Sequence, residues 1–573
     1  MTAVFHVFGQ ANNNPPSEKV GLVTDRTLYI AGEQVQFSAL VSSELQTGES
    51  KVLYAEIITP DGKRKVGNKF SINKSFSNGC LLIPEEILTG VYYIRAYTKY
   101  MRNAGPESYA YVAIKIVNPL SNEILTNSDV TTSNNEFIEE SDGKEDAFNV
   151  SMAKNEYGAG ENVSVTLSIN NSSGSFMVPQ ILNVAVVPEA SSKVFLRKQQ
   201  SRDPDVGFRR NLTQSTEDTL VGFRRNPTTG DHPVQTMDFY PESRGVSITG
   251  QLKDGTNGNP VAGGRVNLSI IGQGRDFEAM QTDSTGHYYF SLPDYTGYRD
   301  IFLCAEKDSL TKPILLVDND FCSIPVHLPS PEFKLSLEER TAALNMAHNI
   351  RLTKYFNSDT LPCGNQHEST TNAFYGKPST VLVFDQYVQL PTLEEYFNEL
   401  PSAVRVRKQN GHKYFKVIGD RAEMNFFNPL VMVDWVAVNN PEKILAASPA
   451  NIARIEVITV PYVKGNITYG GIVSIISKKG DFAGIDLPAS GIFFNYLFLA
   501  DSCHCRVREV ESPELPDSRN TLYWNPDLEL DANNSSAFSF KTSATAGKYN
   551  IILKGIESNG ELYEQKVDFE VKE

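Results

Sequence analysis

A group of three metal-binding residue types lies late in the sequence. Cys503, His504 and Cys505 offer ligands that suit zinc. Structural zinc sites, however, usually separate their cysteines by about two to four residues and need four ligands. Neighbouring residues of a strand also point to opposite faces, so these side chains would not converge. His287 alternates with strand residues and has no ligand partner nearby, which favours a structural or exposed histidine. We therefore predict no metal-binding residue.

The motifs of common enzyme classes are missing. The sequence contains no G-x-S-x-G, no H-E-x-x-H and no Walker loop. Gly272-Gln273-Gly274 does not continue into a dinucleotide-binding fingerprint, and the 8 histidines are scattered along the chain. We predict a protein that is not an enzyme, with no catalytic residue, no cofactor-binding residue and no cofactor.

A basic and aromatic hexapeptide, Val-Gly-Phe-Arg-Arg-Asn, occurs at residues 206–211 and again at 221–226. One interpretation is a loop that binds an anion or a lipid headgroup. The other is a duplicated, solvent-exposed insertion. We favour the insertion, because runs of charge are usually solvated and loops tolerate added residues.

The composition describes the molecule that must carry these residues. With 573 residues, the chain should form about three to five domains. Its 40% hydrophobic and 21% charged residues are typical of folded proteins, and 25 Tyr with 31 Phe favour strands. A net charge of −15 opposes nucleic-acid binding. The longest apolar runs, such as residues 491–500, are too short to span a membrane as a helix.

The cysteines and the N-terminal residues give information on the cellular compartment in which the protein works. Six cysteines are too few for a disulfide scaffold, although Cys304 and Cys322 could bridge two strands of one domain. Residues 1–18 contain a short apolar run and then small residues at Gly9 and Ala11. We interpret them as the remainder of a signal peptide followed by a polar mature start. A frayed terminus is the alternative.

Two segments of the chain share one sandwich pattern. Residues 19–118 contain strands with alternating polarity, such as 35–41 and 90–97, at the spacing of a β-sandwich. Their Tyr29-x-x-Gly32-Glu33-x-Val35 recurs as Tyr157-x-x-Gly160-Glu161-x-Val163 in a second unit at 147–245. The acidic residues 119–146 between the two units predict a linker.

This motif, together with Gly-Val-Tyr-Tyr-Ile-Arg-Ala-Tyr at 90–97, resembles the macroglobulin-type β-sandwich domains of Bacteroidota exported proteins. Macroglobulins with a thioester carry Cys-Gly-Glu-Gln, and here Cys363-Gly364-Asn365-Gln366 keeps that spacing. The thioester of that family lies in a large helical domain for which this chain has no room, and the surrounding residues indicate a loop. We therefore favour no thioester here. A protease trap without a thioester, with residues 191–245 as its bait region, is an alternative function.

The third unit, residues 246–330, resembles the transthyretin-like carboxypeptidase regulatory domain. It carries Gly-Gln-Leu-Lys-Asp at 250–254, Pro-Val-Ala-Gly at 260–263 and Thr-Asp-x-x-Gly-x-Tyr-x-Phe at 282–290. These domains are small sandwiches without the peptidase zinc site. Residues 331–378 then form a helix and loop connector. Its helix at 336–357 starts with a capping box of Ser336 and Glu339. Its apolar stripe is Leu337, Ala342, Leu344, Ala347, Ile350 and Tyr355.

Residues 379–482 alternate strands and helices and resemble the plug domain of TonB-dependent outer-membrane receptors. The motifs are Ile-Ala-Arg-Ile-Glu-Val at 452–457, Tyr-Gly at 469–470 and Gly-Ile-Val-Ser-Ile-Ile-Ser-Lys-Lys-Gly at 471–480. Trp435 stands where such plugs usually have glycine, which predicts an altered loop. Only 93 residues follow Gly480, too few for the receptor's barrel of about 22 strands. The plug-like domain is therefore interpreted as a reused interaction module.

The remaining residues are a connector at 483–518 and a C-terminal β-sandwich segment at 519–573. The fold class is mainly β and multi-domain, with Ig/macroglobulin-like and transthyretin-like sandwiches plus a small α+β plug-like domain. The domain order predicts a non-enzymatic binding or scaffold protein of the cell envelope, in the periplasm or at the outer membrane. Envelope proteins or an outer-membrane complex are the expected partners, without nucleic acid and without a transmembrane segment of its own. An accessory component of a TonB-dependent uptake system is a further alternative.

Overall fold

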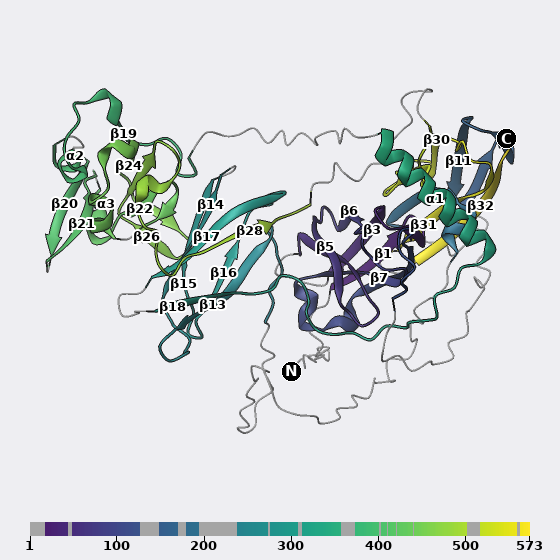
Figure 1. Ribbon diagram of the computed structural model, residues 1–573, viewed down its shortest axis with the longest axis horizontal. Helices are drawn as coiled ribbons and strands as arrows, with labels where there is room; N and C mark the ends of the chain where they lie inside the picture. The colour runs from purple at the N-terminus through teal and green to yellow at the C-terminus, as the bar shows by residue number, and fades with distance from the viewer. Residues whose placement is uncertain are drawn as a thin grey trace, which may run out of the picture.

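The structure is a computed structural model, and most of the chain that it describes forms β-strands, as predicted. Four units follow one another along the long axis of Figure 1. In that order they are sandwich B (residues 148–193 and 516–572), sandwich A (18–125), sandwich C (247–317 and 492–497) and unit D (373–490). The described residues are 18–43, 49–125, 148–169, 179–193, 238–272, 275–306, 312–356, 373–399, 403–409, 411–419, 421–438, 440–500, 516–557 and 562–572.

Sandwich A comprises residues 18–125. Its two sheets have the strand orders β1-β3-β6 and β2-β8-β7-β4-β5. Alternate residues of β3 point into the core, where Val35, Phe37 and Ala39 are fully buried. The strands are β1 (Glu18–Thr24), β2 (Leu28–Ile30), β3 (Gln34–Ser43), β4 (Val52–Ile58), β5 (Arg64–Ser71), β6 (Phe76–Leu82), β7 (Gly90–Thr98) and β8 (Ala110–Val117), with short 3-10 turns η1 (Tyr100–Asn103) and η2 (Pro106–Ser108).

Sandwich B is built from two distant segments of the chain. Its sheet orders, β9-β11-β30 and β10-β32-β31-β12-β29, repeat those of sandwich A strand for strand. Both sandwiches also contain one parallel pair, β2 with β8 and β10 with β32. The first segment supplies β9 (Phe148–Met152), β10 (Glu156–Gly158), β11 (Asn162–Ile169), β12 (Ile181–Pro188) and η3 (Glu189–Ser192). The second supplies β29 (Tyr523–Asn525), β30 (Ser535–Lys541), β31 (Gly547–Ile556) and β32 (Leu562–Lys572).

The repeated Gly-Glu motif forms the same turn in both sandwiches. Gly32 and Gly160 have positive φ angles of 87° and 68°, a region that suits glycine. The carboxylate of Glu33 accepts a hydrogen bond from the backbone N–H of Ile30 at 2.6 Å, and that of Glu161 from Gly158 at 2.8 Å. The shared sequence therefore reflects a shared turn at the same point of one topology.

Sandwich C has the sheet orders β16-β13-β18 and β15-β14-β17-β28. Its last strand comes from far along the chain, because β28 pairs antiparallel with β17 after the whole of unit D has intervened. The strands are β13 (Ser247–Asp254), β14 (Arg265–Ile271), β15 (Asp276–Gln281), β16 (His287–Ser291), β17 (Tyr298–Glu306), β18 (Pro313–Val317) and β28 (Ile492–Leu497).

Unit D, residues 373–490, contains a mixed sheet in the order β19-β24-β27-β22-β23. One face packs against two short helices. The other face packs against β15 of sandwich C through Phe277 and Ala279. The sheet strands are β19 (Thr380–Val383), β22 (Leu430–Val433), β23 (Val436–Ala437), β24 (Ile452–Ile458) and β27 (Ile472–Ser477). The other elements are α2 (Leu393–Glu399), α3 (Pro441–Leu445), the hairpins β20 (Val404–Gln409) with β21 (His412–Val417) and β25 (Tyr462–Lys464) with β26 (Ile467–Tyr469), and the 3-10 turns η4 (Phe384–Gln386), η5 (Ala422–Phe426), η6 (Pro449–Asn451) and η7 (Phe482–Gly484).

Helix α1 (Leu337–Phe356) confirms the predicted helix and its capping box. The backbone N–H of Ser336 donates to the Glu339 carboxylate at 2.8 Å, and the N–H of Glu339 donates to the Ser336 hydroxyl at 3.1 Å. The predicted apolar stripe is wrong in part, since Leu337, Leu344 and Tyr355 are 81%, 71% and 80% exposed. The buried face instead packs on β2 and contains Ala343, Met346 and Ala347.

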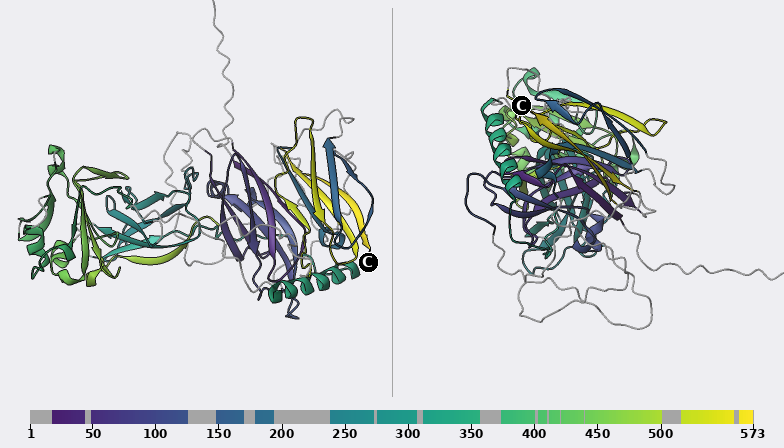
Figure 2. Two further views of the ribbon diagram at one scale, coloured as in Figure 1. Left: turned by 90° about the horizontal axis from the view of Figure 1, so that it is seen from above. Right: turned by 90° about the vertical axis from the view of Figure 1, so that its right-hand side faces the viewer.

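Helix α1 also joins sandwiches A and B. Lys115 of sandwich A binds Glu339 at 2.7 Å, while Asn349 of the helix donates to Asn520 next to sandwich B at 2.9 Å. The two sandwiches themselves stand face to face, as Figure 2 shows. Their contact includes an apolar cluster made of Val23, Leu40, Ile181 and Ile556 with Phe76.

Buried charges join sandwich A to the segments around sandwich C. Lys69, 2% exposed, binds Asp320 at 2.5 Å, and its ammonium also donates to the carbonyl of Leu497. Arg95 is fully buried, pairs with Glu56 at 2.6 Å and donates to the carbonyl of Cys322 at 3.0 Å. One continuous apolar core contains residues of both sandwiches. The four units are therefore held in series by buried contacts.

Two features of the domain division differ from the sequence prediction. Segment 519–573 does not stand apart, because its strands complete the sandwich begun at residue 148. The connector 483–518 contains β28, which belongs to sandwich C. Alternating polarity reveals that a segment is a strand but not which strand it pairs with, so both pairings were missed. Among the described residues, no helix is long and apolar enough to cross a membrane.

Candidate functional site

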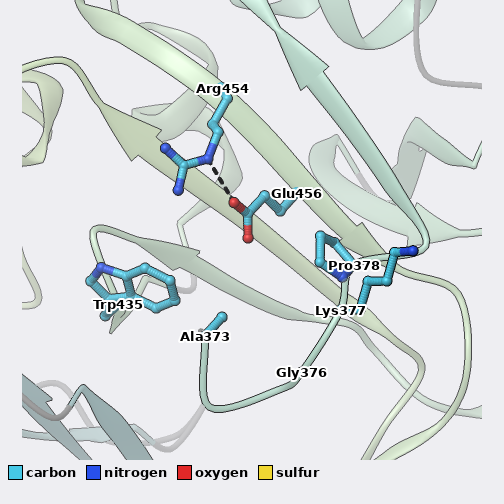
Figure 3. Close-up of a pocket in the computed structure, with 7 residues that line it drawn as sticks. All are labelled: Ala373, Gly376, Lys377, Pro378, Trp435, Arg454 and Glu456. Carbon is cyan, nitrogen blue, oxygen red and sulfur yellow. Dashed lines mark hydrogen bonds and ion pairs between the residues drawn. The ribbon is translucent and has the colours of Figure 1, made fainter. Parts of the chain in front are cut away.

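A cavity of about 370 Å³ opens on unit D, where its sheet meets the loop that precedes β19. Figure 3 shows Arg454 and Glu456 on one side of this space, with Trp435 and Ala373 across from them. Because side chains of a strand alternate, Arg454 and Glu456 of β24 share one face of the sheet. The lining residues are Ala373, Gly376, Lys377, Pro378, Trp435, Arg454 and Glu456.

Trp435 occupies a conformation that side chains other than glycine rarely adopt. Val433 pairs with Val436, so Asp434 and Trp435 form a two-residue hairpin turn between β22 and β23. Both have positive φ angles, 44° and 74°. Turns of this kind favour Asn-Gly or Asp-Gly, so Asp434 suits its position and Trp435 does not. The turn keeps its tight form, and the departure from glycine changes the side chain that it presents.

Aromatic and cationic neighbours hold the indole in place. Trp435 is 5% exposed and stacks on Tyr375, with ring centroids 5.8 Å apart. The guanidinium of Arg275, from sandwich C, lies 4.9 Å from the centre of the indole. Phe374 approaches edge-on at 6.3 Å. Packing and cation–π attraction therefore offset a backbone strain of about 1–2 kcal/mol. Strain kept at the wall of a cavity is a recognised mark of function.

The other wall is a polar cluster. The Nε of Arg454 donates to one oxygen of Glu456 at 2.6 Å, and the hydroxyl of Tyr375 donates to the other oxygen, also at 2.6 Å. Burial, together with this bond to the carboxylate, raises the pKa of Tyr375 far above its ordinary value, so the phenol stays protonated. Both Glu456 oxygens are thus engaged, and this carboxylate is fixed in position.

The carboxylate of Asp434 stabilises the turn through three hydrogen bonds. It accepts from the backbone N–H and the hydroxyl of Ser477 at 2.8 and 2.6 Å, and from the N–H of Phe482 at 2.9 Å. These bonds tie the strained turn to β27, whose Ile472-to-Ser477 sequence supplied the plug-like resemblance. Positioning of Trp435 therefore depends on residues that the resemblance already singled out.

The structure places the other predicted candidates as follows. The Cys363–Gln366 pair, the Cys503-His504-Cys505 group and the repeats at 206–226 lie outside the described residues. His287 is exposed and its Nδ1 lies 2.8 Å from the Thr285 hydroxyl. Cys304 and Cys322 are free, so the disulfide considered from sequence does not form. Within the described part of the chain, no group of three or more His, Cys, Asp and Glu could hold a metal.

Sequence reasoning reached part of this cavity. Trp435 was noted as a departure, and Arg454 with Glu456 formed part of the plug-like motif. Tyr375 and Lys377 were missed, because they lie in a loop before the predicted domain boundary at 379. The period of two in Arg454-Ile455-Glu456 was the available signal, since it places a cation and an acid together on one face of a strand.

Comparisons with known proteins give likeness of fold alone. No protein-family model matches the chain, and no curated protein does. Among solved structures, a variant of Salmonella alpha-2-macroglobulin is 9% identical, with a TM-score of 0.23, over 97% of this chain and 40% of that one. Native Escherichia coli alpha-2-macroglobulin is 8% identical, with a TM-score of 0.23 and the same two coverages of 97% and 40%. The chain thus spans less than half the length of these macroglobulins. The Yersinia pseudotuberculosis adhesin InvE is 11% identical, with a TM-score of 0.13, over 72% of this chain and 77% of that one.

Proposed function

We propose that the protein is a non-enzymatic binding and scaffold protein of the cell envelope, and that it recognises its partner through the Trp435 cavity of unit D. It is exported and works in the periplasm or at the outer membrane, next to envelope proteins, as the resemblance to exported plug-containing proteins implies. Sandwiches A, B and C serve as the arm that carries unit D.

The strained Trp435 at the cavity wall carries this proposal. A glycine at position 435 would form the same turn without strain, so the tryptophan has a purpose other than folding the hairpin. Aromatic side chains that are fixed by their neighbours make good binding anchors, because little side-chain entropy is lost on association. Unit D, which contains the cavity, lies at the opposite end of the row of units from sandwich B (Figure 1), and the cavity opens on the side of unit D where Arg275 of sandwich C reaches Trp435.

The arrangement of the arm supports the scaffold role. The buried ion pair of Lys69 with Asp320 and the hydrogen bond from Arg95 to the carbonyl of Cys322 join sandwich A to the segment that follows β18 of sandwich C. Helix α1 joins sandwich A to sandwich B. Lys464 of unit D binds Glu278 of sandwich C at 3.0 Å, close to the apolar contact made by Phe277. A recognition site held by such contacts keeps a fixed position relative to the rest of the chain, which is what a scaffold needs.

Site-specific photocrosslinking in the source cell tests the proposal. A benzoylphenylalanine in place of Lys377, at the cavity rim, should give a discrete crosslinked product with an envelope protein. The same probe in place of Lys408, an exposed residue of β20 in the same unit, is the matched control. The product at position 377 should be lost when Trp435→Ala is added. Equal products from both positions, or no product from position 377, would contradict the proposal.

A further inference from the structure

We infer that the Trp435 cavity takes a monocarboxylate with a small apolar body, such as the C-terminal residues of a peptide chain or a free short-chain acid. This inference rests on the proposed function and names the ligand chemistry of the same site. It follows from the unused hydrogen-bonding capacity of Arg454, from the balance of charge, and from the apolar parts of the wall.

Arg454 has donors to spare. Its Nε binds Glu456, whereas its two terminal nitrogens make no hydrogen bond to any residue in the described ranges. Figure 3 shows the guanidinium facing the space above Trp435. A planar guanidinium with two free nitrogens matches the two oxygens of a carboxylate. Since Glu456 fixes the guanidinium from its other edge, little entropy is lost when a ligand binds.

The balance of charge favours a monoanion. Two cations, Arg454 and Lys377, and one carboxylate, Glu456, line the cavity, which leaves a single excess positive charge. A monocarboxylate neutralises this charge. A phosphate dianion would leave an excess negative charge beside the Glu456 carboxylate, and the chain as a whole, at −15, repels polyanions. Lys377 is exposed, so its contribution is a long-range attraction that salt screens.

The rest of the wall accepts a small apolar group. Ala373, Pro378 and the indole edge of Trp435 provide apolar surface next to the cationic site. The volume of about 370 Å³ lies near the lower end of the range that ligand pockets span, roughly 300–1,000 Å³. These features fit a carboxylate attached to small residues and leave no room for a folded domain.

Tryptophan fluorescence of the full chain can measure this binding. The chain contains 2 tryptophans, so Trp524→Phe leaves Trp435 as the single reporter. The probes are acetyl-Ala-Ala-Ala with a free C-terminal carboxylate, the same peptide as its C-terminal amide, and butyrate. We expect the peptide acid to bind in a saturable manner and the amide to bind at least about tenfold more weakly, because it cannot form the charged pair. Butyrate distinguishes a peptide C-terminus from a free short-chain acid as the ligand. Binding of both acids indicates a general carboxylate site, and binding of the peptide acid alone indicates a site for peptide C-termini.

Three variants test which residues bind the carboxylate. Arg454→Lys keeps the charge but loses the planar fork, and should weaken binding of the acid by about tenfold. Lys377→Gln should weaken binding by about two- to threefold, and this difference should vanish at high salt. Lys408→Gln, which removes an exposed charge of the same unit away from the cavity, should change nothing. Circular dichroism of each variant checks that its fold is intact.

Equal binding of the acid and the amide, or no saturable binding of any acid, would overturn the inference. So would an Arg454→Lys variant that binds the acid as tightly as the parent. If the acids fail to bind while the probe at position 377 still crosslinks an envelope protein, the carboxylate inference falls and the proposed function stands. Absence of the crosslink at position 377 in the chain that keeps Trp435 counts against the proposed function itself.

Discussion

The strain at Trp435 gives the sharpest prediction about the site. At an ordinary position, replacing glycine by alanine stabilises a protein by about 0.4–1 kcal/mol, because alanine has fewer unfolded conformations. At a φ of +74° alanine instead incurs roughly 1–2 kcal/mol of strain that glycine avoids. The difference predicts that Trp435→Gly is more stable than Trp435→Ala by about 0.5–1 kcal/mol. Both variants should be less stable than the parent by roughly 2–5 kcal/mol, since each removes the same buried indole.

Hydrogen exchange measured by mass spectrometry suits this comparison, because it reports local opening within a multi-domain chain. Peptides that cover residues 430–437 should exchange roughly two- to fivefold faster in Trp435→Ala than in Trp435→Gly. The matched control is the pair Thr380→Ala and Thr380→Gly on β19 of the same sheet. There the glycine variant should exchange faster than the alanine variant, which is the reverse of the order expected at position 435. If Trp435→Ala exchanges as slowly as Trp435→Gly, the turn does not hold residue 435 at positive φ and the reasoning is refuted.

Three further predictions concern the arm. Burial raises the pKa of Glu242, against the opposing effect of Lys99, so its ionised form costs stability in the folded state. The free energy of unfolding should therefore fall as the pH rises above the ordinary glutamate value and through this raised pKa. Glu242→Gln should make this fall shallower in melting curves recorded from pH 4 to 8, while Glu33 and Glu56, whose pKa values burial also raises, keep their own contributions. A parallel pH dependence of parent and variant would contradict this. Glu56→Ala should cost about 3–5 kcal/mol by leaving Arg95 buried without its partner, and Glu56→Met with Arg95→Met should cost clearly less, as calorimetry of all variants can show. Ser336→Ala should lower the stability of α1 by about 1 kcal/mol, seen as faster exchange of its first turn only.

The two copies of the Gly-Glu turn have different surroundings. In sandwich A the turn is covered, and Arg26 donates to Thr521 at 2.5 Å in the segment that enters sandwich B. In sandwich B the corresponding Lys154 keeps its ion pair with Glu161 at 2.7 Å, but the two side chains are 49% and 38% exposed. The turn itself is thus intact in both copies, and only the first is used as a joint between units.

The three-stranded sheets of sandwiches A and B, β1-β3-β6 and β9-β11-β30, also differ in the surroundings of their outer faces. In sandwich A, Val23 and Leu40 point outward and pack against sandwich B. The equivalent sheet of sandwich B presents small polar residues to solvent, among them Asn149, Ser151 and Thr166. A polar outer face is what the end of a stack of repeated units requires. The same topology therefore serves once as a joint and once as a cap.

The sequence alone predicted the parts of this fold whose signal is local. The capping box of Ser336 and Glu339, the Gly-Glu turns and four strands of unit D, β19, β22, β24 and β27, all follow from neighbours within about four residues. Pairing between distant segments could not be predicted, because alternating polarity is the same for any partner strand. The completion of sandwich B by β29–β32 and of sandwich C by β28 are pairings of this kind.

The residues of the candidate site also differ in whether a local sequence signal pointed to them. Trp435 was noted because it departs from the glycine of the plug-like pattern, and Arg454 with Glu456 because they belong to the plug-like motif, but none of the three was predicted to be a site residue. Tyr375 reaches Glu456 from a loop 81 positions earlier in the chain, and Arg275 reaches Trp435 from another sandwich. The first contact depends on how the loop before β19 folds onto the sheet of unit D, and the second on how sandwich C packs against unit D, and no pattern of a few residues encodes either.

In the proposed function, the four units form one rigid arm that holds the Trp435 cavity at a fixed place. Pulsed electron–electron resonance between spin labels introduced at Lys408 of unit D and Lys548 of sandwich B measures this directly. Both residues are exposed, and unit D and sandwich B lie at opposite ends of the row of units in Figure 1. We predict one narrow distance distribution, which should broaden when Glu56→Ala and Lys69→Ala break the buried pairs of sandwich A. A broad distribution in the parent chain would contradict the claim.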